Sequence, residues 1–265
     1  MKKPLLYWIL AFIITVAAGY YQRLTGPTYA VTGYTNLDGN RISYSLDRSH
    51  GGETDHTVKL NAQDSSLSGM IKWKRYKTND EWQFIEMNYI DGILAGYLPH
   101  QPPAGKLEYQ LILKNDKQEI IIPAKPVVIR FKGDVPLYIL IPHIIFIFAA
   151  MLLSNRTAFE CFVDKPKLKS YTVWTFILLL IGGMILGPVV QKFAFGEYWT
   201  GFPFGTDLTD NKTLIAFIGW IIALVAVFKS DKPKWYILIA AIIMFIIFII
   251  PHSLFGSELD YGTLE

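Results

Sequence analysis

Two histidines lie at the ends of long apolar segments, where ionisable side chains are costly and are often functional. His143 follows Ile141-Pro142 inside one apolar run, and His252 follows Ile250-Pro251 at the end of another. Trp199 lies in an aromatic stretch between two further runs. Two imidazoles beneath aromatic side chains could ligate a metal ion or both faces of a haem iron. His143, His252 and Trp199 are therefore candidate cofactor-binding residues.

The loop at residues 191–212 that contains Trp199 ends with acidic and basic side chains. Carboxylates can bind divalent ions, so Asp207 and Asp210 are candidate metal ligands. The same two residues also lie where a helix N-cap belongs, because a carboxylate there accepts backbone N–H bonds. Tyr198, Phe202 and Lys212 are candidate binding residues, although aromatic residues in such a loop also form interfacial belts.

One segment of this loop is similar to a known family. Phe195-Gly196-Glu197-Tyr198-Trp199-Thr200, with Asp207, Asp210 and the run from Lys212 to Trp220, resembles the outer tryptophan-rich loop and following helix of haem-handling proteins in cytochrome c biogenesis. In that family outward-facing histidines flank the loop, and His143 and His252 could match them. The resemblance implies haem b as cofactor, with electron transfer or haem handling as the function. This loop departs from the family in having one tryptophan rather than several and in lacking the Trp-Asp pair.

Five apolar segments must position these residues, at 5–21, 136–154, 171–190, 213–228 and 235–251. Each is long enough, or nearly so, to cross a hydrocarbon core about 30 Å thick, which takes roughly 20 helical residues. The sequence therefore predicts an α-helical bundle of about five transmembrane helices in contact with membrane lipid. Gly182-Gly183 and Gly187-Pro188 interrupt the third segment, and such glycines favour close packing of helices.

Lysine and arginine predict the orientation, because segments flanked by them tend to stay in the cytoplasm. They precede the first segment and follow the second and fourth: Lys2, Lys3, Arg156, Lys165, Lys167, Lys169, Lys229, Lys232 and Lys234. The tail after Pro251 has neither. We expect a multi-pass protein of the bacterial inner membrane with a periplasmic C-terminus. Val16-Ala17-Ala18 also suits a cleaved signal peptide, which would leave four spans and the same topology.

Residues 24–134 predict an all-β extracytoplasmic sandwich domain, inserted between a first helix at 1–23 and a membrane domain at 135–265. Apolar and polar residues alternate there, as in Ile42, Tyr44 and Leu46, which is typical of strands with one buried face. Turn residues such as Asp38-Gly39 and Asp91-Gly92 separate the runs. The spacing predicts seven or so short strands around one core.

Met87 to Pro99, followed by Gln101 to Tyr109, resembles fibronectin type III and immunoglobulin-like modules of bacterial surface proteins. In those modules an aromatic strand ends in Leu-x-Pro, and a Pro/Gly turn leads to a strand that starts with a buried tyrosine. Tyr109 would be that tyrosine. The resemblance implies a domain that binds a protein, a glycan or another domain and is rarely catalytic.

Other chemistry has little support in the sequence. The loop from Ser49 to His56 could bind a metal through His50, Asp55 and His56, but it is also typical of an exposed polar loop. Cys161 is the only cysteine, so no disulfide is expected. Outside the cytoplasm nucleic acid is not an expected partner. The preferred interpretation is a non-enzymatic protein whose β domain docks another envelope or membrane protein; the alternative is the haem or metal centre.

Overall fold

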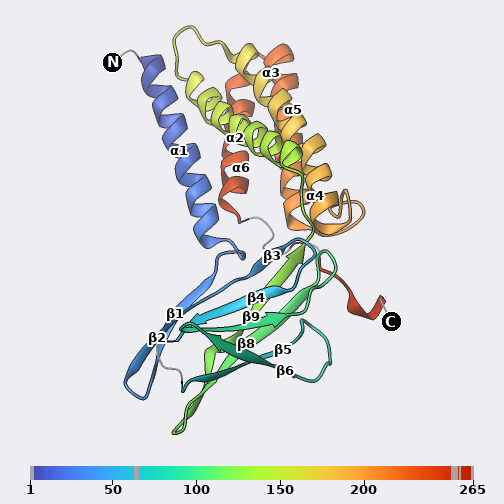
Figure 1. Ribbon diagram of the computed structural model, residues 1–265. Helices are drawn as coiled ribbons and strands as arrows, with labels where there is room; N and C mark the ends of the chain where they lie inside the picture. Colours follow the sequence, from blue (N-terminus) through green and yellow to red (C-terminus); the bar gives the residue numbers. More distant parts are fainter. Residues whose placement is uncertain (1–2, 63–65, 252–255, 257, 264–265) are drawn as a thin grey trace. The chain divides into compact units, whose positions relative to one another are not determined.

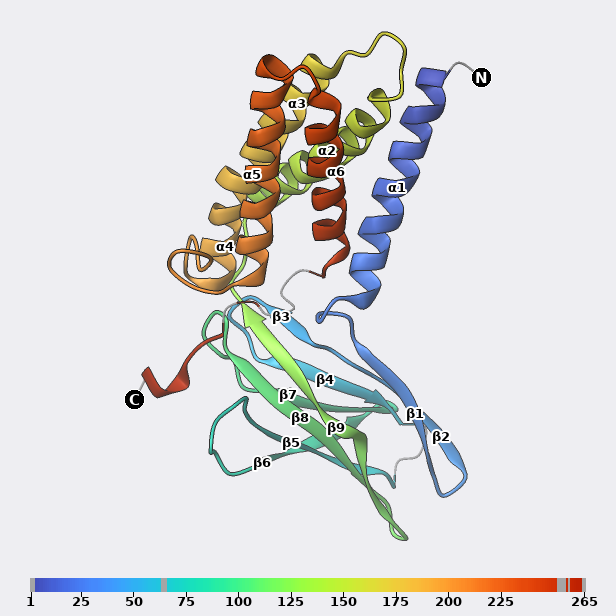
Figure 2. The same cartoon turned by 180° about the vertical axis from the view of Figure 1, so that it is seen from behind.

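The computed structural model describes residues 3–62, 66–251, 256 and 258–263. The chain divides into two compact units (Figures 1 and 2). One is a helix bundle made of Met1–Pro27 and Val135–Ser257, and the other is a β domain made of Thr28–Asp134 and Glu258–Glu265. The last residues of the chain therefore belong to the β domain, although the bundle separates them from it in sequence.

Apolar segments form the helices of the bundle. Their bounds are α1 (Lys3–Thr25), α2 (Leu137–Glu160), α3 (Leu168–Leu179), the π-helical turn η1 (Leu180–Leu186), α4 (Gly187–Phe195), α5 (Leu208–Lys229) and α6 (Pro233–Ile249). In the part of the chain that the structure describes, four helices are long and apolar enough to cross a membrane: Pro4–Thr25, Leu137–Glu160, Leu168–Phe195 and Leu208–Lys229. The fifth predicted span, α6, is an apolar helix of 17 residues and is shorter than these.

The interruption predicted in the third segment is the π-helical turn η1, which joins α3 to α4. A Cβ at Gly182 would lie 2.9 Å from the backbone nitrogen of Ile147 and 2.9 Å from Cβ of Phe146. Only glycine lets η1 approach α2 this closely, so the expected close packing is confirmed. In the π-helical turn the Gly187 N–H donates to the Gly182 carbonyl.

A buried ion pair lies near the end of α2. The Arg156 guanidinium lies 2.6 Å from the Glu160 carboxylate, and both side chains are buried. The rings of Tyr7, Trp8 and Tyr171 lie 5.0 to 5.8 Å from the guanidinium carbon. The sequence placed Arg156 in the connection after the second span, but it lies within α2. Paired charges and aromatic faces make its burial tolerable, and they join α1, α2 and α3.

The described residues of the β domain form nine strands where about seven were expected. They are β1 (Val31–Leu37), β2 (Asn40–Leu46), β3 (Ser49–Gly51), β4 (His56–Asn61), β5 (Ser68–Arg75), β6 (Gln83–Ile90), β7 (Ile93–Leu98), β8 (Lys106–Lys114) and β9 (Glu119–Lys132). Seven strands form one sheet in the order β3-β9-β8-β5-β6-β7-β4, and β1 and β2 form a hairpin. All pairs are antiparallel except β3 with β9.

The predicted two-sheet sandwich is wrong, because the seven-stranded sheet curls into a nearly closed barrel. The β1–β2 hairpin lies in the opening, where β2 packs against β4 and β1 against β9. One core fills the interior, with Ile71, Leu98, Leu107, Tyr109 and Phe131 among its most buried side chains. Alternation along a strand shows that one face is buried. It does not show whether the buried face packs on a second sheet, as in a sandwich, or on the opposite wall of the same curled sheet, as in a barrel.

The predicted turns at Asp38-Gly39 and Asp91-Gly92 are confirmed as two-residue hairpin loops. In each turn both residues have positive φ, at 50° and 82° in the first and 50° and 80° in the second. Aspartate followed by glycine tolerates this backbone, and the resulting twist matches that of the flanking strands. These two loops determine the register of β1 with β2 and of β6 with β7.

We predict that Gly182→Ala destabilises the bundle by about 1–3 kcal/mol, because the new methyl group overpacks the backbone of α2. The measurement is the thermal unfolding midpoint of the purified chain in detergent. Gly219→Ala is the matched control, since a Cβ there lies 3.8 Å from Ala240 in ordinary contact. It should leave the midpoint unchanged or raise it slightly. Equal effects of the two substitutions would contradict the assigned role of Gly182.

Candidate functional site

A cavity of about 210 Å³ lies inside the helix bundle. It is at the end where α1, α4 and α6 finish and where α2 and α5 begin. Much of its wall is apolar or glycine, including Ile147, Leu179, Gly183, Gly187, Pro188, Val190, Phe195, Ala216, Ile247 and Phe248. Polar side chains also line it: Gln22, His143, Gln191, Asp207, Thr209, Asp210, Lys212 and Thr213.

His143 lies on α2 and reaches this cavity. Its Nδ1 lies 2.9 Å from the carbonyl oxygen of Gly182 in η1. A carbonyl only accepts, so Nδ1 carries the proton and donates, which leaves Nε2 as an acceptor in the neutral ring. No described residue donates a hydrogen bond to Nε2. The imidazole therefore bridges α2 to the π-helical turn through one nitrogen and keeps the other available.

Lys212 was predicted as a binding residue of the outer loop, but it lies inside α5 and is only 3% exposed. Its ammonium donates to the carbonyl oxygens of Ile250 at 2.8 Å and Pro251 at 3.4 Å. The side-chain amide of Gln22 donates to Phe248 and Ile250 carbonyls at 2.8 and 3.1 Å. These two side chains satisfy carbonyls at the C-terminal end of α6, which have no partner within the helix.

Asp207 and Asp210 are engaged in hydrogen bonds within the bundle. Oδ1 of Asp207 accepts from the backbone nitrogens of Thr209 at 2.7 Å and Asp210 at 3.3 Å, which confirms the predicted N-cap of α5. Oδ2 of Asp210 accepts from the Thr200 N–H at 2.7 Å and the Gln191 amide at 3.0 Å. The described residues include no group of three or more His, Cys, Asp or Glu placed to hold a metal ion.

The aromatic candidates divide between the cavity and the surface. Trp199 lines the cavity, and its indole N–H donates to the Phe202 carbonyl at 3.0 Å. The Tyr198 and Phe202 side chains are 57% and 69% exposed and do not line it. His252, the second proposed haem ligand, lies outside the described residues.

The fold thus brings His143 of α2 to one cavity with Trp199, Asp207, Asp210 and Lys212, which lie close together in the sequence. Two residues of this cavity were missed, Gln22 and Gln191. Both are polar residues at the end of an apolar segment, and that position was the available signal.

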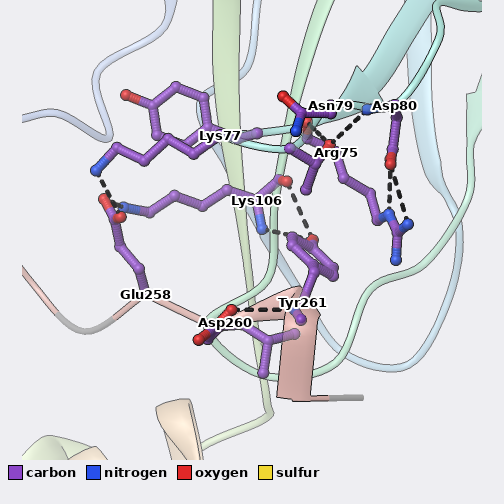
Figure 3. A pocket seen from close by; sticks show the side chains of 12 residues that line it. Arg75, Lys77, Asn79, Asp80, Lys106, Glu258, Asp260 and Tyr261 are labelled. Atoms are coloured by element: carbon purple, nitrogen blue, oxygen red, sulfur yellow. Dashed lines mark hydrogen bonds and ion pairs between the residues drawn. The ribbon is translucent and has the colours of Figure 1, made fainter. Parts of the chain in front are cut away.

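The β domain carries a second candidate site, a groove of about 560 Å³. One wall consists of residues 75–80 and Lys106, and the other is the C-terminal segment from Glu258 to Gly262, both within the β unit (Figure 3). The Glu258 carboxylate bridges two ammonium groups, at 2.7 Å from Lys77 and 2.6 Å from Lys106.

Tyr261 anchors the C-terminal segment to β8 and is only 6% exposed. Its hydroxyl accepts from the Lys106 N–H at 2.9 Å and lies 3.0 Å from two acceptors, the Lys106 carbonyl and the Gln101 side-chain oxygen. The Arg75 guanidinium lies 5.1 Å from the centre of the Tyr261 ring, within the range of a cation–π contact. The sequence held one signal for this groove. Basic residues cluster at 72–77, whereas the tail after Pro251 contains acidic residues but no lysine or arginine.

Charges in the groove shift the titration of its groups. Burial by itself raises the pKa of Glu258, but hydrogen bonds and charge from Lys106 and Lys77 outweigh burial and lower the pKa below 4.5. The pKa of Lys106 is lowered because burial penalises its charge more than Glu258 stabilises it. Glu258 is therefore ionised in the docked segment at neutral pH.

The segment from Ser49 to His56 differs from the exposed loop that was expected. Ser49–Gly51 is strand β3, and His56 begins β4 with 6% exposure. The Nδ1 atoms of His50 and His56 lie 3.3 Å apart, so one ring donates to the other. Burial and then the charge of His50 lower the pKa of His56, against an opposing effect of Asp47. The two histidines thus link the strands β3 and β4 through their rings.

We predict that acid releases the C-terminal segment. The pKa of Glu258 is lower in the docked segment than its ordinary value of 4.5. Ionised Glu258 therefore stabilises docking fully above pH 4.5, and this stabilisation is lost as the pH falls through the lowered pKa. Fluorescence anisotropy of a dye at the C-terminus should therefore drop below about pH 4.5. In Glu258→Gln this transition should disappear, and anisotropy should be low throughout. An identical acid transition in the variant would contradict the role of Glu258.

Comparisons with protein-family models, with curated proteins and with solved structures found no match for this chain. The resemblances to fibronectin type III modules and to haem-handling proteins therefore remain predictions from short segments. Function has to be argued from the cavity and the groove.

Proposed function

We propose that this chain is a non-enzymatic protein of the bacterial inner membrane whose β domain docks an extended segment of another envelope protein on the periplasmic side. One observation carries the proposal: the chain's own C-terminal segment forms one wall of the groove and is held against the rest of the β domain through Glu258 and Tyr261. A partner segment of the same chemistry has an acidic residue with a tyrosine three positions later.

The groove recognises such a segment by both charge and main chain. Lys77 and Lys106 offer two ammonium groups to one carboxylate. The Leu259 N–H donates to the Ala104 carbonyl at 3.3 Å, which is a main-chain bond of the kind used to bind extended peptides. Ion pairs of exposed side chains such as Lys77 contribute little to stability. The docked segment is therefore exchangeable for a competing one.

The proposed orientation follows from charge. Lysine and arginine gather at the α2–α3 and α5–α6 connections, as in Lys165, Lys167 and Lys232, with Lys229 at the end of α5. Connections of this kind stay in the cytoplasm. The β domain, which follows α1, and the C-terminal segment then face the periplasm.

The C-terminal segment also bears on whether α6 crosses the membrane. Between the β domain and this segment the chain passes through three helices long enough to span: Leu137–Glu160, Leu168–Phe195 and Leu208–Lys229. If α6 did not cross, the segment and the β domain would lie on opposite faces and could not form one unit. A 17-residue helix is about 26 Å long, within the lower limit for a span. We therefore propose that α6 crosses.

Single cysteines test this topology in a chain whose native Cys161 is replaced by serine. We predict that a membrane-impermeant maleimide labels Ser45→Cys in β2 and Asp260→Cys in the tail when the inner membrane is intact. Asp231→Cys, between α5 and α6, should label only after permeabilisation. If Asp260→Cys and Asp231→Cys were both labelled while the inner membrane is intact, the two positions would lie on the same side, and α6 would not cross.

Docking is tested with a chain that ends at Ser257 and a fluorescent peptide of residues 256–265. We predict that the peptide binds the shortened chain at least tenfold more tightly than the full chain, because the intact tail competes at a high effective concentration. Fluorescence anisotropy measures both affinities. Adding Lys77→Glu to the shortened chain should weaken binding about tenfold, since attraction becomes repulsion.

Lys117→Glu is the matched control for Lys77→Glu. Lys117 is also exposed and also pairs with an acidic residue, Asp38, at 2.7 Å, but it does not line the groove. Its reversal should leave peptide binding unchanged. Equal losses in the two variants would indicate nonspecific attraction, and binding unaffected by Lys77→Glu would refute the proposed groove.

A further inference from the structure

The bundle cavity has a surplus of hydrogen-bond acceptors. Nε2 of His143 and the side-chain oxygens of Gln22 and Gln191 accept no hydrogen bond from any described residue. The Gln22 and Gln191 amide nitrogens are occupied by Phe248, Ile250, Thr200 and Asp210. Among the described residues, Lys212 donates to two carbonyl oxygens, and an ammonium has three N–H groups. A ligand that suits this lining donates hydrogen bonds and can accept one.

Charge in the cavity is close to balanced. Asp207 and Asp210 are opposed by Lys212 and by the N-terminal end of α5, which carries about half a positive charge. The carboxylate oxygens Oδ1 of Asp207 and Oδ2 of Asp210 already accept hydrogen bonds from neighbouring N–H groups. An ionic ligand would gain little from this arrangement and would have to be desolvated. A neutral headgroup fits better.

The remaining wall suits an apolar body. Leu179, Val190, Ile247 and Phe248 lie beside the polar groups. The volume of about 210 Å³ is below the roughly 300–1,000 Å³ of sites for drug-sized ligands, so the cavity suits a small headgroup and the first part of a chain whose remainder stays in lipid. The cavity lies at helix ends, where a spanning bundle meets the interface that holds the headgroups of amphiphiles. Such a position gives a lipid-borne molecule direct access.

We propose that this cavity binds a neutral amphiphile with a hydroxyl headgroup, a long-chain alcohol or phenol taken from the surrounding lipid. A hydroxyl is one donor and two acceptors in a single small group. It donates to Nε2 of His143 and accepts from the spare N–H of Lys212, while its chain lies against the apolar wall. This site is on the bundle and is independent of the docking groove on the β domain.

A matched pair of ligands tests the proposal on the full chain in detergent: 1-dodecanol and its methyl ether, which cannot donate. At a concentration 100 times its dissociation constant, a ligand specific to the folded state raises the unfolding midpoint by about 5–10 °C in a chain of this size. We predict that the alcohol produces such a rise and that the ether produces less than half of it. Equal shifts from the two ligands would overturn the hydroxyl assignment.

Two substitutions locate the binding site. His143→Asn keeps a donor in the place of Nδ1 for the Gly182 carbonyl but removes the Nε2 acceptor, so the alcohol should lose its advantage over the ether. Gly187→Leu fills the cavity, because a Cβ at Gly187 lies only in ordinary contact, 3.8 Å from the His143 ring. This variant should lose the response to both ligands.

Ser154→Ala is the control, since Ser154 is buried on the same helix and lies outside the cavity. Its response to both ligands should equal that of the unchanged protein. A full alcohol response in both His143→Asn and Gly187→Leu would show that the alcohol binds elsewhere and would refute the site. Stabilisation of the bundle by the alcohol does not depend on peptide docking to the groove, so each proposal can be refuted without the other.

Discussion

A bundle in hydrocarbon must satisfy its backbone polar groups from within, because lipid offers no hydrogen bonds. Helices of this chain are long and apolar enough to span, and their ends near the cavity satisfy such groups with side chains. Lys212 and Gln22 satisfy carbonyls at the end of α6, Asp207 caps α5, and His143 bonds the Gly182 carbonyl in the π-helical turn. The polar residues that could form a ligand site are the same residues that hold the helix ends. These side chains therefore serve both to satisfy the helix ends and to line the cavity.

The same constraint explains the buried pair at the other end of α2. An isolated Arg156 would be costly to bury, and Glu160 lies one turn away to neutralise it. Three aromatic rings from α1 and α3 surround the guanidinium. Close contact of η1 with α2 depends instead on Gly182, which has no side chain to separate them. Polar pairing and small residues, rather than apolar contact alone, determine how the helices meet.

The β domain is stabilised in a different way. Its barrel buries a continuous apolar core, and this burial is the main favourable term for a domain in water. Glu258 and Tyr261 are held on its surface by charge and hydrogen bonds, so this contact depends on the ionisation of Glu258 in a way that the core does not. The chain passes between the two units three times, after residues 27, 134 and 257. The last passage brings the tail back to the β domain.

The sequence alone determined the elements that have a strong local cause. Apolar runs of spanning length predicted the helices, Asp-Gly pairs predicted hairpin loops, alternation predicted strands, and Asp207 predicted a helix cap. It also named five residues of the cavity as candidates and expected His143 beneath the aromatic stretch that contains Trp199. Tertiary structure decided that all five line one cavity, that Lys212 is buried, that the sheet curls into a nearly closed barrel, and that the tail returns to β8. The physical reason is that periodicity records burial of one residue at a time, whereas the partner across a cavity or a barrel comes from a distant part of the chain.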